Sequence, residues 1–215
     1  MRIAYVCADQ NLPVFGPRSA SVHVQEVIRA LRAQGASVEL FAARFDGAVP
    51  HDFQNVVLHS LPPPPKGDLR SRELAGFNFN PQLNDALGAA GEFDLLYERY
   101  SMWSFAGIEY AKTHATRSVL EVNAPLIEEQ EHDGSLAHKN VARQVAQRVF
   151  SNATVVAASS AEVAAYVERH AGSRGHVYVV PDGVDTQRFT PEARPATAAD
   201  PNVFTVGYVG SMKPW

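Results

Sequence analysis

The segment "RIAYVCADQNLPVFGPRSASVHVQEVIRALRAQGASVELFAA" (residues 2–43) holds the pattern on which the predicted fold depends. Apolar, β-prone residues fill positions 2–8 and 37–43, which predicts two strands. Between them, apolar residues recur three, four and seven positions apart, which predicts an amphipathic helix over 22–34. A strand, a crossover helix and a second strand together predict one unit of a parallel sheet.

The loop before this helix has the chemistry of an anion site. Gly16 allows a ligand to approach the backbone closely, Arg18 adds positive charge, and Ser19 or Ser21 can cap the helix. A helix start presents unpaired N–H groups and a partial positive charge. We therefore interpret Gly16, Arg18 and Ser19 as candidate phosphate-binding residues. An ordinary capped loop is the alternative.

The alternation of strand and helix patterns continues to about residue 181 and predicts an α/β fold, a Rossmann-like parallel sheet with helices on both faces. The exception is 61–80, where a proline run predicts a polyproline segment that leads into an irregular loop. Further strands are predicted at 55–61, 93–100, 118–123, 153–159 and 176–181, and further helices near 81–90, 102–114, 135–151 and 161–172.

Two of the later helices carry cap signals at their starts. Ser135 is placed to cap the helix that ends near residue 151. Ser159 and Glu162 have the spacing of a capping box ahead of the next helix.

Composition limits the function classes. The chain has 215 residues, 46% of them hydrophobic, and a net charge of −4, so it can bury a core but offers no basic surface for nucleic acid. The single cysteine, Cys7, lies in an apolar run, which favours a reducing, cytoplasmic location without disulfides. No apolar stretch of about 18 residues occurs, so we expect no membrane-spanning helix.

The C-terminal region predicts a division into domains. Residues 190–202 contain three prolines and no large apolar residue, which indicates an interdomain linker. Residues 203–215 have the pattern of a first strand, and the chain stops before a helix follows. We therefore expect a first domain over 1–189 and the start of a truncated second domain at 203–215. Such a strand must pair with the first domain, pair with another copy, or stay mobile.

Six segments in order resemble the N-terminal half of a family 4 glycosyltransferase of the GT-B fold. The most specific of them is "VVPDGVD" (179–185), which has Asp182 where that family usually has asparagine. The resemblance covers essentially the whole chain. The other segments are "FGPRSASVHVQEVIRALRAQGASVEL" (15–40), "YERYSMWSFAGIEYA" (97–111), "VLEVNAPLIEEQ" (119–130), "SAEVAAY" (160–166) and "VGYVGSMKPW" (206–215).

The resemblance implies transfer of a sugar from a nucleotide-sugar donor, UDP- or GDP-linked, with retention at the anomeric carbon and without a metal or other cofactor. In that family most nucleotide contacts belong to the C-terminal domain, so this chain alone is expected to be inactive. Pro181, Asp182 and Gly183 form a fixed turn that suits an interdomain hinge.

The ends of the predicted strands carry the candidate acceptor and catalytic residues. Arg99 suits an acceptor phosphate or carboxylate, and a salt bridge to Glu98 or Glu121 is the structural alternative. Asn123 stands where many family members have a histidine, so it is expected to position a hydroxyl rather than move a proton. His132 supplies the missing imidazole only if its segment folds back.

His23, at the helix start, either faces the site or lies at the surface. The acceptor itself is open. Lys66, Arg70 and Arg72 within 61–80 suit a phosphorylated or lipid-linked acceptor, and ordinary loop solubility explains them equally well. With Phe77 and Phe79 nearby, this segment also suits peripheral contact with a membrane.

Two functions from other classes remain open. A nicotinamide-dependent oxidoreductase would use Glu39 as its ribose ligand, but residues 7–19 contain no G-x-G-x-x-G turn. A non-catalytic sugar- or partner-binding module of the same fold is favoured by Asn123, which cannot act as a proton shuttle.

Overall fold

The structure is a computed structural model that describes residues 1–62, 67–171, 175–187, 189–190, 192 and 202–208. The chain divides into two compact units, Met1–Pro181 and Asp182–Trp215. The division falls within the turn predicted as a hinge and ahead of the boundary expected at residue 189. The elements below belong to the first unit.

A parallel sheet forms the centre of the first unit, which confirms the predicted α/β class. Among the described residues it has seven strands in the order β3-β2-β1-β4-β5-β6-β7. Chain order reverses between the neighbours β1 and β4, and ligands of such sheets gather at the carboxyl ends beside this reversal. The strands are β1 (Arg2–Cys7), β2 (Ser37–Ala42), β3 (Val57–Ser60), β4 (Leu95–Arg99), β5 (Arg117–Val122), β6 (Val155–Ala158) and β7 (Val177–Val179).

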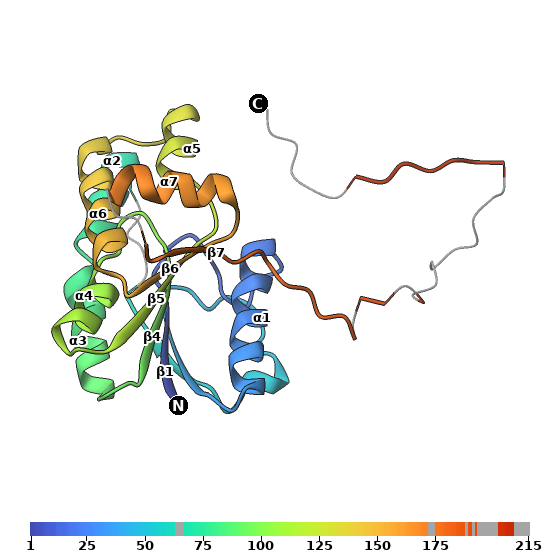
Figure 1. The fold of residues 1–215 in the computed structure, drawn as a ribbon, viewed down its shortest axis with the longest axis horizontal. Coiled ribbons are helices and arrows are strands. Elements are labelled where there is room, and N and C mark those ends of the chain that lie inside the picture. The colour runs from blue at the N-terminus through green and yellow to red at the C-terminus, as the bar shows by residue number, and fades with distance from the viewer. Residues whose placement is uncertain (63–66, 172–174, 188, 191, 193–201, 209–215) are drawn as a thin grey trace. The chain divides into compact units, whose positions relative to one another are not determined.

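Helices cover both faces of this sheet unequally. In Figure 1, α1 lies on one side, and α3, α4, α6 and α7 lie on the other. The apolar core is accordingly divided: α1 packs on one face through Val24 and Ile28, and α6 packs on the other through Val145 and Val149. The helices are α1 (Ser19–Ala33), α2 (Leu69–Phe77), α3 (Asn80–Ala90), α4 (Ala106–Thr113), α5 (Leu126–His132), α6 (Lys139–Asn152) and α7 (Ala161–Ala171), with a 3₁₀ turn η1 (His51–Phe53).

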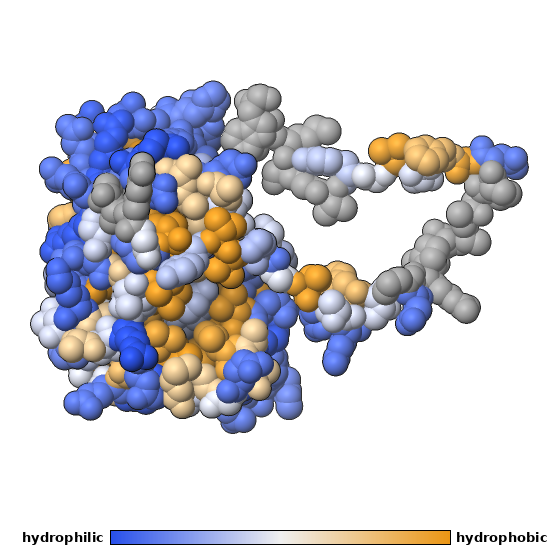
Figure 2. Space-filling model, viewed as in Figure 1, coloured by the Kyte–Doolittle hydropathy of each residue, from blue (hydrophilic) through white to orange (hydrophobic). Residues whose placement is uncertain are grey.

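The β7 edge of the sheet leaves apolar side chains in contact with solvent. Tyr178 is 55% exposed, and Val179 and Val180 are about equally exposed. Figure 2 shows apolar surface gathered over the strands between α1 and the helices of the opposite side.

The irregular loop predicted within 61–80 is wrong over residues 69–77, which form α2. The Asp68 carboxylate caps this helix by accepting from the backbone N–H of Ser71 at 2.8 Å. The buried positions of α2 are Glu73 and Gly76, so the helix has almost no apolar periodicity to detect.

The predicted helix caps need three corrections. α1 begins at Ser19, earlier than position 22, with Arg18 at its N-cap and no capping side chain among the described residues. α6 begins at Lys139 rather than after Ser135. α7 is capped by Ser160, whose hydroxyl accepts from the N–H of Val163 at 3.3 Å.

The expected C-terminal strand is absent from the part of 203–215 that is described. Residues 203–208 form no regular element, and Phe204 is 92% exposed. A strand needs hydrogen-bonding partners on a neighbouring strand, and this segment has no sheet of its own. Positions 209–215 and most of the predicted linker at 190–202 lie outside the described residues.

The predicted contact of residues 61–80 with a membrane surface needs a partial correction. No helix in the described ranges has both the length and the apolar content that crossing a bilayer requires. Phe79 is only 4% exposed, and Phe77 packs on Phe105 with ring centroids 5.4 Å apart, so Phe79 in particular cannot enter a headgroup layer. Arg70 and Arg72 are exposed on α2, and Lys66 lies outside the described residues.

Candidate functional site

The candidate site lies at the carboxyl ends of β4 and β5. Arg99 ends β4 and is directly opposite Glu121 of β5 in the parallel register. Asn123 follows two positions after Glu121, so alternation along the strand turns all three side chains to the same face. This face is the one that α1 covers, because Tyr97, two positions before Arg99, packs in the core cluster of α1.

Asn123 bridges the two charged residues. Its side-chain nitrogen Nδ2 donates to Glu121 Oε1 at 2.9 Å. Its oxygen Oδ1 accepts from Nη1 of Arg99. The Asn123 backbone carbonyl also accepts from the Ser159 hydroxyl at 3.1 Å, which fixes the end of β5 to the loop after β6. Two of the residues expected at the strand ends, Arg99 and Asn123, are therefore in contact, and Ser159 is bonded to Asn123.

His23 joins this network from α1. Its ring nitrogen Nε2 is hydrogen-bonded to Glu121 Oε1 across 98 residues of sequence, and it lies 3.5 Å from Asn123 Nδ2. The sequence left open whether His23 faces the site. The sequence does hold a signal for this orientation. His23 follows the candidate phosphate-binding residue Ser19 by four positions, which places both residues on the same side of the helix, one turn apart.

Glu121 is a buried carboxylate at the centre of the network. Burial raises the pKa of Glu121, but hydrogen bonds from His23 and Asn123 and the nearby charge of Arg99 outweigh it and hold the pKa below its ordinary value. The group is therefore ionised near neutral pH. Its second oxygen, Oε2, has no hydrogen-bond partner among the described residues, and neither has the buried hydroxyl of Tyr5. Burial is the main cause that raises the pKa of Tyr5, and the negative charge of Glu121 raises it further.

The candidate phosphate loop leads into the same helix. Gly16 donates its N–H to the Pro13 carbonyl at 3.0 Å, and a Cβ at Gly16 would lie 2.9 Å from Pro13 Cγ, so this tight turn needs glycine. Gln25 of α1 donates to the Val14 carbonyl at 2.8 Å and holds the loop on the helix. The first turn of α1 has no acidic residue, which leaves the helix start electropositive.

Glu98 does not join Arg99. Successive strand residues face opposite sides of the sheet, and Glu98 is buried beneath α4 with 1% of its surface exposed. Ser104 donates to its Oε1 at 2.6 Å. Burial raises the pKa of Glu98 to about 7, against hydrogen bonds from Ser104 and the Ile108 backbone. We therefore leave Glu98 out of the acceptor site.

The remaining predicted site residues lie elsewhere. His132 is the last residue of α5 and is exposed, and it takes no part in the network around Glu121. Its catalytic role stays a prediction. The boundary between the units falls between Pro181 and Asp182, and the hinge role of these residues and Gly183 also stays a prediction.

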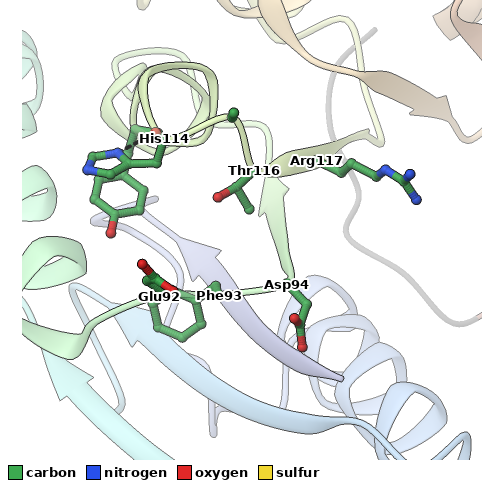
Figure 3. Close-up of a pocket in the computed structure, with 8 residues that line it drawn as sticks. Glu92, Phe93, Asp94, His114, Thr116 and Arg117 are labelled. Carbon is green, nitrogen blue, oxygen red and sulfur yellow. Dashed lines mark hydrogen bonds between the residues drawn. The ribbon is translucent and has the colours of Figure 1, made fainter.

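A separate cavity of about 400 Å³ opens at the opposite ends of the strands (Figure 3). It lies where β4 and β5 begin, and the His114 ring stacks on Tyr110 at 4.0 Å between centroids. It is therefore not part of the site at Arg99 and Glu121. Its lining is Glu92, Phe93, Asp94, Tyr110, His114, Ala115, Thr116 and Arg117.

Two relatives with assigned names match most of the chain. One is a D-inositol 3-phosphate glycosyltransferase of Arthrobacter sp. (strain FB24), 27% identical over 206 residues, which are 83% of this chain and 45% of that protein. The other is the enzyme of the same name from Pseudarthrobacter chlorophenolicus, 24% identical over 210 residues, 90% of this chain and 49% of that protein. The chain thus spans about half the length of these relatives.

Solved structures share the fold. Sucrose-phosphate synthase from Thermosynechococcus elongatus superposes with a TM-score of 0.56 at 15% identity, covering 87% of this chain and 92% of that chain. Anabaena HepE in complex with UDP and glucose superposes with a TM-score of 0.57 at 18% identity, covering 89% of this chain and 47% of that chain. The model of Glycosyltransferase Family 4 matches residues 20–188. The chain therefore belongs to Glycosyltransferase Family 4.

Proposed function

We propose that this chain is the acceptor-side half of an enzyme that transfers a sugar from a nucleotide-sugar to an acceptor hydroxyl. The observation that carries the proposal is the network of His23, Glu121, Asn123 and Arg99 beside the electropositive start of α1. Family membership and the relatives' names support it.

The reaction breaks the bond between the anomeric carbon and the diphosphate oxygen and forms a bond from that carbon to the acceptor oxygen on the same face of the sugar. The acceptor's proton passes to the leaving diphosphate. Negative charge therefore grows on phosphate oxygens in the transition state. In our proposal the backbone N–H of Ser19 and the Arg18 side chain meet this charge without a metal, and Gly16, whose own N–H is bonded to the Pro13 carbonyl, shapes the turn that leads to them.

The donor is proposed to be UDP- or GDP-linked. Anabaena HepE, which shares the fold, forms a complex with UDP and glucose, and this supports a UDP-sugar. We infer that the other half of the enzyme supplies most nucleotide contacts, and that residues 1–215 alone are inactive.

The acceptor is proposed to carry a phosphate, either free or lipid-linked. Arg99 is the half-buried cation at the strand ends, and Asn123 orients its guanidinium. A guanidinium held in one orientation favours a phosphate oxyanion. The relatives are named for D-inositol 3-phosphate, which supports an acceptor of this class.

The test uses the full-length gene product with a panel of UDP- and GDP-linked hexoses and D-inositol 3-phosphate as acceptor probe. Release of nucleoside diphosphate is measured with and without acceptor. We expect release that depends on the acceptor, and none from residues 1–215 alone. No release from the full-length protein with any donor contradicts the proposal and favours the non-catalytic module.

The alternative function, a nicotinamide-dependent oxidoreductase, has no support at Glu39, its proposed ribose ligand. Glu39 is the third residue of β2, and its carboxylate is paired with Arg2 at 2.6 Å and His59 at 2.7 Å. An acid that binds a cofactor ribose belongs beyond the carboxyl end of such a strand.

A further inference from the structure

Three histidine–carboxylate pairs join different elements in the part of the chain that the structure describes. His59 pairs with Glu39 between β3 and β2, and His138, which directly precedes α6, pairs with Glu73 of α2, each at 2.7 Å. His23 and Glu121 form the third, between α1 and β5. The side chains are similarly buried: the histidines are 20–25% exposed and the carboxylates 4–11%. Of these three pairs, only His23 and Glu121 belong to the network that also contains Arg99 and Asn123.

His23 occupies the position between the two proposed substrate contacts. On one side, Ser19 precedes it by one helical turn, a rise of about 6 Å toward the start of α1. On the other side, Asn123 lies within 3.5 Å and itself binds Arg99. A sugar that connects a diphosphate at Ser19 to an acceptor at Arg99 would therefore lie close to the helical turn that carries His23.

On the basis of the proposed function, we propose that His23 is a catalytic residue that binds a hydroxyl of the transferred sugar, and that Glu121 is the positioning residue that holds its imidazole. Because Nε2 donates to the ionised Glu121, it is Nδ1 that meets the hydroxyl: a protonated imidazole donates to it and a neutral one accepts from it. The paired carboxylate fixes the ring's orientation. Glu121 is only 6% exposed, so it acts through His23 rather than on the substrate.

The contacts of Asn123 agree with this assignment. The oxygen of its amide accepts from Arg99, and the nitrogen donates to Glu121. Its primary role is then to orient the charged neighbours. The task of holding a hydroxyl, which was expected of Asn123 from the sequence, passes to His23.

The test compares His23→Ala, Glu121→Gln and the double variant in the full-length gene product. We expect kcat/KM for the donor to fall about 10- to 100-fold in His23→Ala, the range for losing one hydrogen bond to a charged group. Affinity for free UDP or GDP should not change. The double variant should be no slower than His23→Ala, because Glu121 acts through the ring that is already missing.

His59→Ala is the matched control, since it breaks a similar pair in the same sheet, distant in sequence from the network. Thermal unfolding of each variant separates lost folding from lost function. An active protein in which His23→Ala behaves as His59→Ala overturns the proposal. A double variant far slower than His23→Ala overturns the positioning role of Glu121.

A second measurement separates this inference from the proposed function. The imidazole NMR signal of His23 is followed in the full-length protein with each nucleotide-sugar of the panel and with UDP or GDP alone. We expect a shift that requires the sugar. An inactive protein that shows this shift overturns only the proposed reaction, and one without it overturns both.

Discussion

Glu98 and Arg99 are neighbours in β4 but meet opposite environments. Arg99 lies in the polar network, whereas Glu98 is buried beneath α4 with one carboxylate oxygen, Oε2, lacking a partner among the described residues. Gly107 permits this arrangement, because a Cβ there would lie 2.3 Å from that oxygen. Arg99 is therefore next in sequence to an acid whose pKa burial raises to about 7, so that Glu98 is mostly protonated below neutral pH.

The raised pKa of Glu98 predicts a pH-dependent stability. The pKa is about 7 in the folded chain against an ordinary value of 4.5, so between these values the folded state binds more protons. The free energy of unfolding should therefore fall as pH rises from about 5 to about 8, by on the order of 2 kcal/mol. Urea unfolding of the wild type and Glu98→Gln at both pH values measures this.

Glu98→Gln should lack this part of the decline, because its amide does not titrate. Equal declines in the two proteins would show that other groups cause the pH dependence.

The sequence predicted which strand ends carry the polar residues, but not all of their contacts. Arg99 and Asn123 could be assigned to one edge because parallel strands end on the same side. The contact of His23 with Glu121 spans 98 residues, and its direction depends on where α1 begins. The opposite direction of Glu98 follows from strand alternation, which rules out the salt bridge to Arg99 that was considered from the sequence.

At the scale of elements, α2 anchors the two residues that lead into another helix, α6. Glu73 accepts from the backbone N–H groups of Ala137 and His138 at 2.8 Å each, and its Oε2 is 2.7 Å from the His138 ring. The start of α6 thus depends on a carboxylate from α2. The local sequence favoured Ser135 as the cap, but its hydroxyl instead donates to the Gln130 carbonyl.

Glu73→Ala should lower the free energy of unfolding by about 3 kcal/mol, because it leaves two partly buried N–H groups and a histidine without the buried carboxylate that they bind. Urea unfolding of residues 1–215 provides the measurement. Asp68→Ala is the control: it removes the exposed cap of α2 itself and should cost clearly less. An equal loss in both variants would contradict the role of Glu73 as an anchor between α2 and the start of α6.

Burial also explains which elements the sequence revealed. The buried strands and α1 and α6 have strong apolar patterns, and they were predicted within a few residues. α2 buries Glu73 and Gly76 instead, so only its tertiary contacts identify it as a helix.

At the scale of the whole molecule, the apolar core belongs to the first unit. Both hydrophobic clusters consist of residues that precede Pro181. The described residues 203–208 add exposed apolar side chains rather than core.

A chain shortened to residues 1–181 should therefore keep the thermal unfolding midpoint of residues 1–215 to within about 2 °C, since no buried cluster is lost. Circular dichroism of both chains measures this. A large drop in the midpoint of the shorter chain would show that the second unit contributes to stability.

The position of His23 on α1 has a consequence for substrate binding. One rigid helix carries both the turn proposed for the donor's phosphates and the ring that is bonded to the acceptor-side network. If one proposed substrate shifts α1 when it binds, it also shifts the His23 contact with Glu121, and with it the site of the other substrate. Thermodynamic reciprocity then requires that the donor tighten acceptor binding by the same factor as the acceptor tightens donor binding.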